Sequence, residues 1–234
     1  MHRKELNERS PLRVLDQSIH GGLGPGNLGV VLARHGVGKS AFLVGVALDD
    51  LMRGRKVLHI SQEHPVEKVR AYYDEIFADL AHEKALSDVW KVRAEMERHR
   101  RIHHYLNRSF SVDKLQGTLA FLRDHGDFRP VTILIDDFDF SAASGEDVAA
   151  LREIARGSEA EMWLSATVHR DVDETSRGIP APLAARAGAI DVILRMAHDG
   201  DAVHITLLKD HDNPDVSDLK LTLDPRSMLI VSEG

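Results

Sequence analysis

The chain has 234 residues, of which 43% are hydrophobic, enough to bury the core of one domain. It contains no cysteine, which excludes a disulfide framework, a thiolate metal site and thiol catalysis, and its net charge of −7 gives no overall field for holding nucleic acid. No window approaches eighteen consecutive apolar residues, so we expect no membrane span and no signal peptide, and a cytoplasmic location fits. We expect residues 1–10 to form a flexible tail, or alternatively an arm that orders on a neighbouring subunit, and residues 11–234 to form a single domain.

An apolar strand is expected to begin at Leu28 and to lead into a glycine-containing loop that ends in Lys39-Ser40. The loop matches G-x-x-x-x-G-K-[ST] at every fixed position but the first, where Ala33 replaces glycine, a change we expect to be tolerated if φ is negative there. Glycines let successive N–H groups turn toward a polyphosphate, and the next helix adds its dipole. We therefore predict a nucleotide site in which Lys39 reaches the terminal phosphates and Ser40 binds Mg²⁺. Its residues are Ala33, Arg34, His35, Gly36, Val37, Gly38, Lys39, Ser40 and Ala41.

A distinctive segment leads into this strand. It contains Leu15-Asp16, then Gly21-Gly22-Leu23, then Pro25-Gly26. The segment resembles the lead-in of the RecA superfamily, and within that superfamily the chain is most similar to KaiC-like and DnaB-like ATPases. The resemblance covers about residues 12–230. It implies an α/β fold, the RecA-like P-loop NTPase, with a mainly parallel sheet flanked by helices on both faces and a C-terminal antiparallel hairpin.

The apolar run from Ala41 to Met52 predicts a buried helix, and Val57 to Ser61 predicts the second strand. Open parallel sheets bind ligands at the carboxyl ends of their strands, where Gln62-Glu63-His64 follow. The resemblance implies that Glu63 polarises the attacking water. Because Pro65 opens the next helix, the alternative is that Glu63 is an ordinary acid at a helix N-terminus.

Three- and four-residue spacing predicts an amphipathic helix from Pro65 to about Arg98, broken once near Ser87. Its far end is basic, which favours a solvated helix face; the alternative is a patch for nucleic acid or another anionic partner. The cations are Lys91, Arg93, Arg98, Arg100, Arg101 and Arg108. The interleaved histidines lack the spacing of a metal site, and we assign no metal to His99, His103 and His104.

A third strand is expected from Ile102 to Leu106, and a helix from a Ser111 cap to about His125. The apolar strand from Val131 to Asp137 ends in carboxylates, which is typical of a Walker B motif. We expect Asp136 to hold Mg²⁺ through water on the γ-phosphate side. A helix follows from Ser144 to Ser158.

The next core strand is expected from Glu161 to Val168, and His169 follows it. The resemblance implies that His169 senses the γ-phosphate at a position where the superfamily often has glutamine. The loop from Asp171 to Pro182 carries more acids than arginines, and the loop after Asp136 carries no cation. Because nucleic-acid binding needs cations against phosphates, the loops do not favour a DNA translocase.

The end of the chain predicts antiparallel structure: a hairpin of Ile190 to Met196 with Ala202 to Leu208, then a last β segment from Leu219 to Val231. The hairpin ends at Lys209-Asp210-His211. The resemblance implies that Lys209 reaches a neighbour's γ-phosphate, and the alternative is a solvated edge lysine. His211 replaces the family's arginine and supplies less charge, so we expect turnover that is slow or that depends on pH or on a partner.

Together these patterns predict an ATP-binding, Mg²⁺-dependent ATPase that acts as an oligomeric switch or motor, with Glu63, Lys39 and Lys209 as catalytic residues. We expect a ring or head-to-tail homo-oligomer and an unidentified protein partner. Two alternatives stay open. One is a recombination or helicase-like ATPase that binds single-stranded DNA, and the other is a nucleotide-gated scaffold with little hydrolysis.

Overall fold

In the computed structural model, strands and helices alternate through most of the chain. The structure describes residues 5, 8, 10–19, 21–105, 109–168, 174–175, 178–213, 216 and 219–232. The helices in order are α2 (Leu12–Ser18), α3 (Lys39–Met52), α4 (Val66–Glu83), α5 (Val89–His99), α6 (Val112–Gly126), α7 (Gly145–Gly157), α8 (Ala181–Ala184) and the 3₁₀ turn η2 (Ala187–Ala189). The strands are β1 (Leu28–Ala33), β2 (Val57–Ser61), β3 (Arg100–His104), β4 (Thr132–Asp136), β5 (Glu161–Thr167), β6 (Val192–Asp199), β7 (Ala202–Asp210), β8 (Leu221–Leu223) and β9 (Ile230–Ser232).

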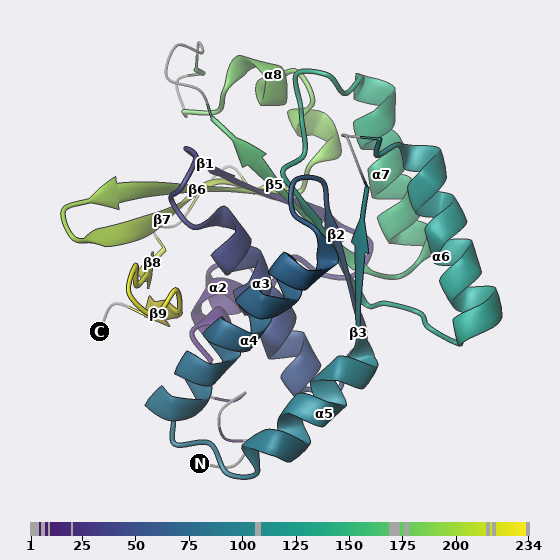
Figure 1. Ribbon diagram of the computed structural model, residues 1–234. Helices are drawn as coiled ribbons and strands as arrows, with labels where there is room; N and C mark the ends of the chain where they lie inside the picture. Colours follow the sequence, from purple (N-terminus) through teal and green to yellow (C-terminus); the bar gives the residue numbers. More distant parts are fainter. Residues whose placement is uncertain are drawn as a thin grey trace.

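The described strands form one nine-stranded sheet in the order β3-β2-β4-β5-β1-β6-β7-β8-β9. Pairing is parallel from β3 through to β6 and antiparallel from β6 to β9. Figure 1 shows α3, α4 and α5 on one face of the sheet and α6 and α7 on the other. This arrangement confirms the predicted α/β fold with its mainly parallel sheet and C-terminal hairpin.

The central strands are largely apolar and buried because helices cover both faces. Strands β1 and β4 are buried at every position, as expected for parallel strands in the middle of a doubly covered sheet. Close packing between neighbouring strands also selects residue size. A Cβ added to Gly29 in β1 would lie 2.6 Å from the Trp163 ring of β5, so the missing side chain makes room for the indole.

Local signals fix two of the helix starts. The Ser111 side chain accepts a hydrogen bond from the Lys114 N–H at 3.3 Å, which confirms the predicted cap of α6. Ser144 and Asp147 form a reciprocal capping box at the start of α7, with the Asp147 N–H 3.0 Å from the Ser144 hydroxyl. Each contact satisfies an N–H group that has no partner within its helix.

The basic segment departs from its prediction. The strand β3 begins at Arg100 rather than Ile102, so Arg100 does not lie on a solvated helix face: it is 5% exposed, and its guanidinium lies 4.4 Å from the centre of the Tyr73 ring. Arg101 lies over the Phe128 ring at 4.7 Å. Sequence spacing missed this because the helix ends at His99 and the chain turns at once into the sheet.

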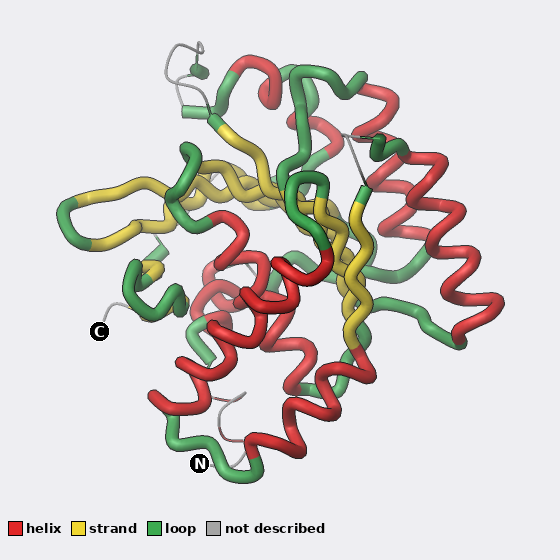
Figure 2. Tube along the Cα trace, viewed as in Figure 1, coloured by secondary structure: helices red, strands yellow, loops and turns green. Residues whose placement is uncertain are grey.

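The helix α2 and the strand β9, near the two ends of the described chain, both lie beside α3 (Figure 2). The lead-in segment contains a helix that the sequence did not predict, α2, whose Leu12 and Leu15 are buried. Of the predicted tail, only Glu5, Glu8 and Ser10 lie among the described residues, so the tail stays a prediction. None of the described helices has the length and apolar character needed to cross a membrane.

Candidate nucleotide site

The loop from Arg34 to Gly38 joins β1 to α3 and exposes main-chain donors at the carboxyl edge of the sheet. Gly36 and Gly38 have φ values of +80° and +113°, a conformation that glycine adopts without cost. Ala33 is the last residue of β1 and is absent from the described residues with positive φ, which confirms that a methyl group is tolerated there. Because α3 starts at Lys39 without a side-chain cap, its first N–H groups have no intrahelical acceptor and suit an anion.

The structure brings Ser40 and Asp136 together, as predicted. The Ser40 hydroxyl donates to one carboxylate oxygen of Asp136 at 2.6 Å, and the Ser165 hydroxyl of β5 donates to the other. Ser165 also accepts the Asp137 N–H at 2.9 Å. Sequence reasoning missed Ser165. The available signal was the Ser165 hydroxyl in the otherwise apolar run Met162 to Ala166. Ser165 is far from Asp136 along the chain, and the pairing of β4 with β5 brings the two together.

Lys39 is only 8% exposed. Burial lowers the pKa of Lys39, and the charges of Asp136, Asp137 and Glu63 oppose that shift. A buried cation at the start of α3, close enough to these carboxylates for their charges to act on it, is placed to bind phosphate oxygens. Asp137 adopts a φ of +60° and accepts from Thr167 at 3.3 Å.

Glu63 lies at the same edge, just beyond the end of β2. Ser61 of β2 pairs with Asp136 of β4, which puts the residues that follow both strands side by side. The Glu63 side chain is 51% exposed, so water reaches it freely. Its charge influences the pKa of Lys39, which ties it electrostatically to the phosphate loop. The predicted acid therefore shares an edge with the predicted phosphate-binding groups.

The oxygens of Ser40 and Asp136 fit a magnesium ion. Mg²⁺ prefers hard oxygen ligands and is usually held by one or two protein groups together with substrate phosphates and water. Both oxygens sit at the start of α3, where the phosphates would lie. In the described part of the chain, no group of three or more His, Cys, Asp or Glu side chains could hold a metal without such help.

Lys209 and His211 lie at the end of β7, where both are bonded within their own chain. The Lys209 ammonium donates to the carbonyl of Ala187 at 2.7 Å and to the carbonyl of Ile190. Burial lowers the pKa of Lys209. His211 Nδ1 lies 2.8 Å from the Asp210 carboxylate, and Nε2 lies 3.1 Å from the Leu23 carbonyl. The end of β7 is thereby fastened to the lead-in segment.

We expect replacement of His211 by glutamine to destabilise the protein in a pH-dependent way. Both ring nitrogens face acceptors, so the contact is complete only in the imidazolium form. Burial lowers the pKa of His211, but the hydrogen bonds to Asp210 and Leu23 outweigh it and raise the pKa overall. A raised histidine pKa gives stability that is fully present below its ordinary value of about 6.5 and is lost as pH rises through the folded value.

The loss of unfolding free energy on His211→Gln should therefore be about 1 kcal/mol at pH 6 and smaller at pH 9, measured by urea denaturation. His198→Gln, at an exposed position of β6, is the control. A loss that is the same at both pH values would contradict the ionic contact.

Two other predicted features are only partly open to description. His169 lies outside the described residues, so its sensor role stays a prediction, and in the loop from 171 to 182 residues 171–173 and 176–177 also lie outside them. In the basic segment, Arg93 pairs with Asp74 at 2.7 Å. Among the other described cations of this segment, Arg100 is buried and Arg101 stacks on Phe128, whereas Lys91 and Arg98 are exposed.

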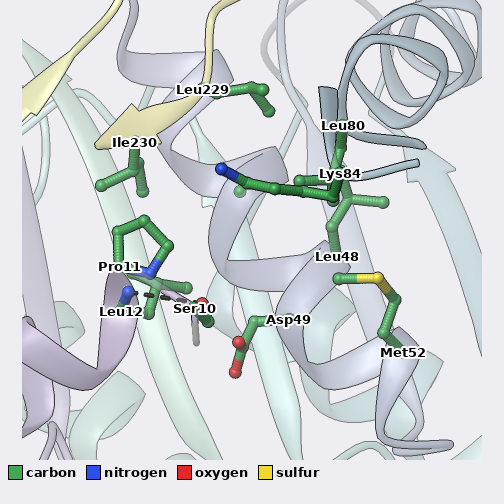
Figure 3. A pocket seen from close by; sticks show the side chains of 11 residues that line it. Ser10, Pro11, Leu12, Leu48, Asp49, Met52, Leu80, Lys84, Leu229 and Ile230 are labelled. Atoms are coloured by element: carbon green, nitrogen blue, oxygen red, sulfur yellow. Dashed lines mark hydrogen bonds between the residues drawn. The ribbon is translucent and has the colours of Figure 1, made fainter. Parts of the chain in front are cut away.

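A cavity of about 220 Å³ lies along the C-terminal half of α3, away from the phosphate loop (Figure 3). Its charged lining groups already have partners: Asp49 pairs with Arg53 at 3.0 Å, and Lys84 pairs with Glu83 at 2.5 Å. The other lining residues are mainly apolar and include Leu48, Met52, Leu80 and Ile230. Such walls do not suit a polyphosphate.

The strand order, the phosphate loop between β1 and α3, and the acid at the end of β4 define a RecA-type P-loop ATPase fold. Among solved structures, the chain is similar to an ATPase domain, with a TM-score of 0.71 and 17% sequence identity over 96% of this chain and 90% of that one. At this identity the similarity shows the fold. No family model matches the sequence, and no curated protein matches it.

Proposed function

We propose that this chain binds ATP with Mg²⁺ and hydrolyses it. The observation that carries the proposal is the 2.6 Å hydrogen bond from Ser40 to Asp136, because it joins the start of the phosphate-loop helix to the acid at the end of β4. Hydroxyl and carboxylate oxygens at this place are the groups that phosphoryl-transfer sites use around a magnesium ion. The similarity to a solved ATPase domain supports the same proposal.

Each residue of the site has a defined task in this proposal. The N–H groups of Gly36, Gly38 and the first turn of α3 bind phosphate oxygens, and Lys39 adds a point charge at the terminal phosphates. Ser40 and Asp136 hold the cation, while Ser165 keeps the Asp136 carboxylate in place. Bound Mg²⁺ neutralises charge on the phosphates.

Glu63 orients the attacking water in this proposal and accepts its proton. The exposed carboxylate can be reached by solvent and lies at the same edge as Asp136. Because β2 pairs with β4, Glu63 lies beside the acid at the end of β4 as well as just before the start of α4. This second neighbour supports a catalytic role for Glu63 and not only a role at the helix N-terminus. The alternative, an acid that only favours the N-terminus of α4, leaves hydrolysis independent of this side chain.

We further propose that the protein acts as an oligomeric switch or motor in which Lys209 contacts a neighbour's nucleotide. To do so, Lys209 must exchange two neutral carbonyl acceptors for phosphate oxygens. Charge-assisted bonds to phosphate are stronger than bonds to carbonyls, which favours the exchange once a neighbour is present. The internal contacts of Lys209 and His211 also favour a second candidate, a nucleotide-gated scaffold with little hydrolysis.

The test is the mass in solution by light scattering, without nucleotide and with ATP and Mg²⁺, alongside phosphate release. ATP-driven assembly with hydrolysis supports the switch or motor, and Glu63→Gln should then reduce phosphate release about 10²-fold or more while leaving assembly intact. The matched control is Glu67→Gln, an exposed acid in the first turn of α4. Nucleotide binding and assembly with no Glu63-dependent hydrolysis would support the scaffold instead.

A further inference from the structure

A histidine is buried in β2, two residues before Ser61, which lies opposite Asp136 of the predicted magnesium site. His59 is 1% exposed, and its Nδ1 lies 2.9 Å from the hydroxyl of Tyr73 in α4. Its second ring nitrogen, Nε2, is buried and has no hydrogen-bond partner among the described residues. A buried polar atom left in this way costs about 1–3 kcal/mol. A phenylalanine at this position would place no unpartnered polar atom in the core and would avoid this cost.

The strand register places His59 beside Asp136. In the pairing of β2 with β4, His59 lies opposite Leu134 and Ser61 lies opposite Asp136. Residues two apart on a strand point to the same face, so His59 and Asp136 are diagonal neighbours on the α3 side of the sheet. The charge of Asp136 acts on the His59 ring, and one water molecule can connect two polar groups that do not touch directly.

The charges around His59 keep its ring neutral. Burial lowers the pKa of His59 to about 4, the carboxylate of Asp136 opposes the shift, and the guanidinium of Arg100 adds to it. Arg100 itself is held by Glu97 and lies 4.4 Å from the centre of the Tyr73 ring. A neutral imidazole offers one donor and one acceptor, so the Tyr73 hydroxyl uses one nitrogen and leaves the other for a second partner.

We propose that His59 is a positioning residue for the magnesium edge, whose Nε2 connects through a buried water molecule to the carboxylate of Asp136. Tyr73 fixes the ring from α4. Because ligands of a metal are oriented by hydrogen bonds from a surrounding set of groups, His59 would tune how strongly Mg²⁺ tightens nucleotide binding. This inference rests on the proposed function, since it concerns the same site.

A purely structural role must be separated from this one, because the His59 to Tyr73 bond also joins α4 to β2. Two substitutions of His59 separate the contributions of its two ring nitrogens. Asparagine places its amide near the position of Nδ1 and keeps only the contact to Tyr73. Glutamine extends to the position of Nε2. The double variant His59→Phe/Tyr73→Phe removes both polar partners together, which leaves no orphan hydroxyl and is expected to remain folded.

The measurement is the affinity for ADP by calorimetry, with Mg²⁺ and with a chelator in its place. The ratio of the two dissociation constants reports magnesium coupling without any hydrolysis. We expect His59→Asn and the double variant to reduce this ratio about 10-fold, and His59→Gln to keep it within about twofold of the native protein. Affinity measured with the chelator should not change. His103→Asn, an exposed histidine of the adjacent β3, is the control.

The outcomes separate the two claims. If the native protein binds no ADP under either condition, the proposed function fails. If it binds ADP and the ratio is unchanged in both His59→Asn and the double variant, the positioning role is wrong while nucleotide binding stands. A ratio kept in His59→Asn but lost in His59→Gln also overturns the inference. It would show that the bond to Tyr73, which joins α4 to β2 and which only asparagine keeps, matters rather than Nε2.

Discussion

Replacing Lys39 with alanine should reduce phosphate release by about 10²- to 10³-fold, a loss typical of removing one preorganised group that stabilises developing charge. The side chain is buried at the start of α3, and the charges of Asp136, Asp137 and Glu63 act on it. The measurement is steady-state phosphate release at saturating ATP and Mg²⁺, together with ATP affinity.

The control for this result is Lys91→Ala, which removes an exposed lysine of α5 and should leave phosphate release unchanged. Lys39→Ala must also retain the native unfolding transition, because a folding defect would imitate a catalytic one. Retention of more than about a tenth of native activity in a folded Lys39→Ala protein would contradict the assignment of the phosphate loop as the reaction site.

Replacing Glu161 with glutamine should stabilise the protein at pH 8 by about 2 kcal/mol and have little effect near pH 4.5. Glu161 opens β5, where burial raises its pKa to about 7; Asp50 and Asp16 add to the shift, while Arg55 and the Gly24 N–H oppose it. The folded protein therefore holds a proton that the unfolded chain has lost between pH 4.5 and 7. Unfolding free energy falls as pH rises through that range.

Urea denaturation of the native protein and of Glu161→Gln at pH 4.5, 6 and 8 measures this effect. The difference between the two should grow with pH, because glutamine cannot ionise among the neighbouring carboxylates. Glu146→Gln in the first turn of α7 is the control, since that acid is exposed and favours the helix N-terminus. A difference between native and Glu161→Gln proteins that is constant with pH would show that the Glu161 carboxyl ionises normally.

Much of the fold followed from local patterns. The apolar runs that contain β1 and β4 have the length of a strand, and both strands are buried at every position. Runs of this kind could be assigned to the sheet from the sequence. The phosphate loop is a contiguous segment whose glycines set the backbone directly, so its geometry at Gly36 and Gly38 could be predicted. The hairpin of β6 and β7 is also local, and its strands agree with the prediction.

The rest of the site depends on contacts between distant segments. Ser165 meets Asp136 because β5 pairs with β4, a register that no local signal sets. His59 meets Tyr73 only once α4 has folded back over β2. The sequence predicted Arg100 to be a surface cation, but in the structure β3 places its guanidinium against the Tyr73 ring. Charge and spacing describe a residue's neighbours along the chain, whereas burial depends on what packs above it.

Local sequence was sufficient to predict the phosphate loop and the acid at the end of β4, because backbone conformation and hydrophobic periodicity act over a few residues, and the resemblance of the lead-in segment implied the class of fold. The folded chain was needed to show that Ser40 bonds to Asp136 and that Ser165 holds the same carboxylate. It was also needed to show that Lys209 and His211 are bonded within their own chain. These contacts require that side chains far apart in sequence meet, and their meeting is set by strand register and helix packing across the whole domain.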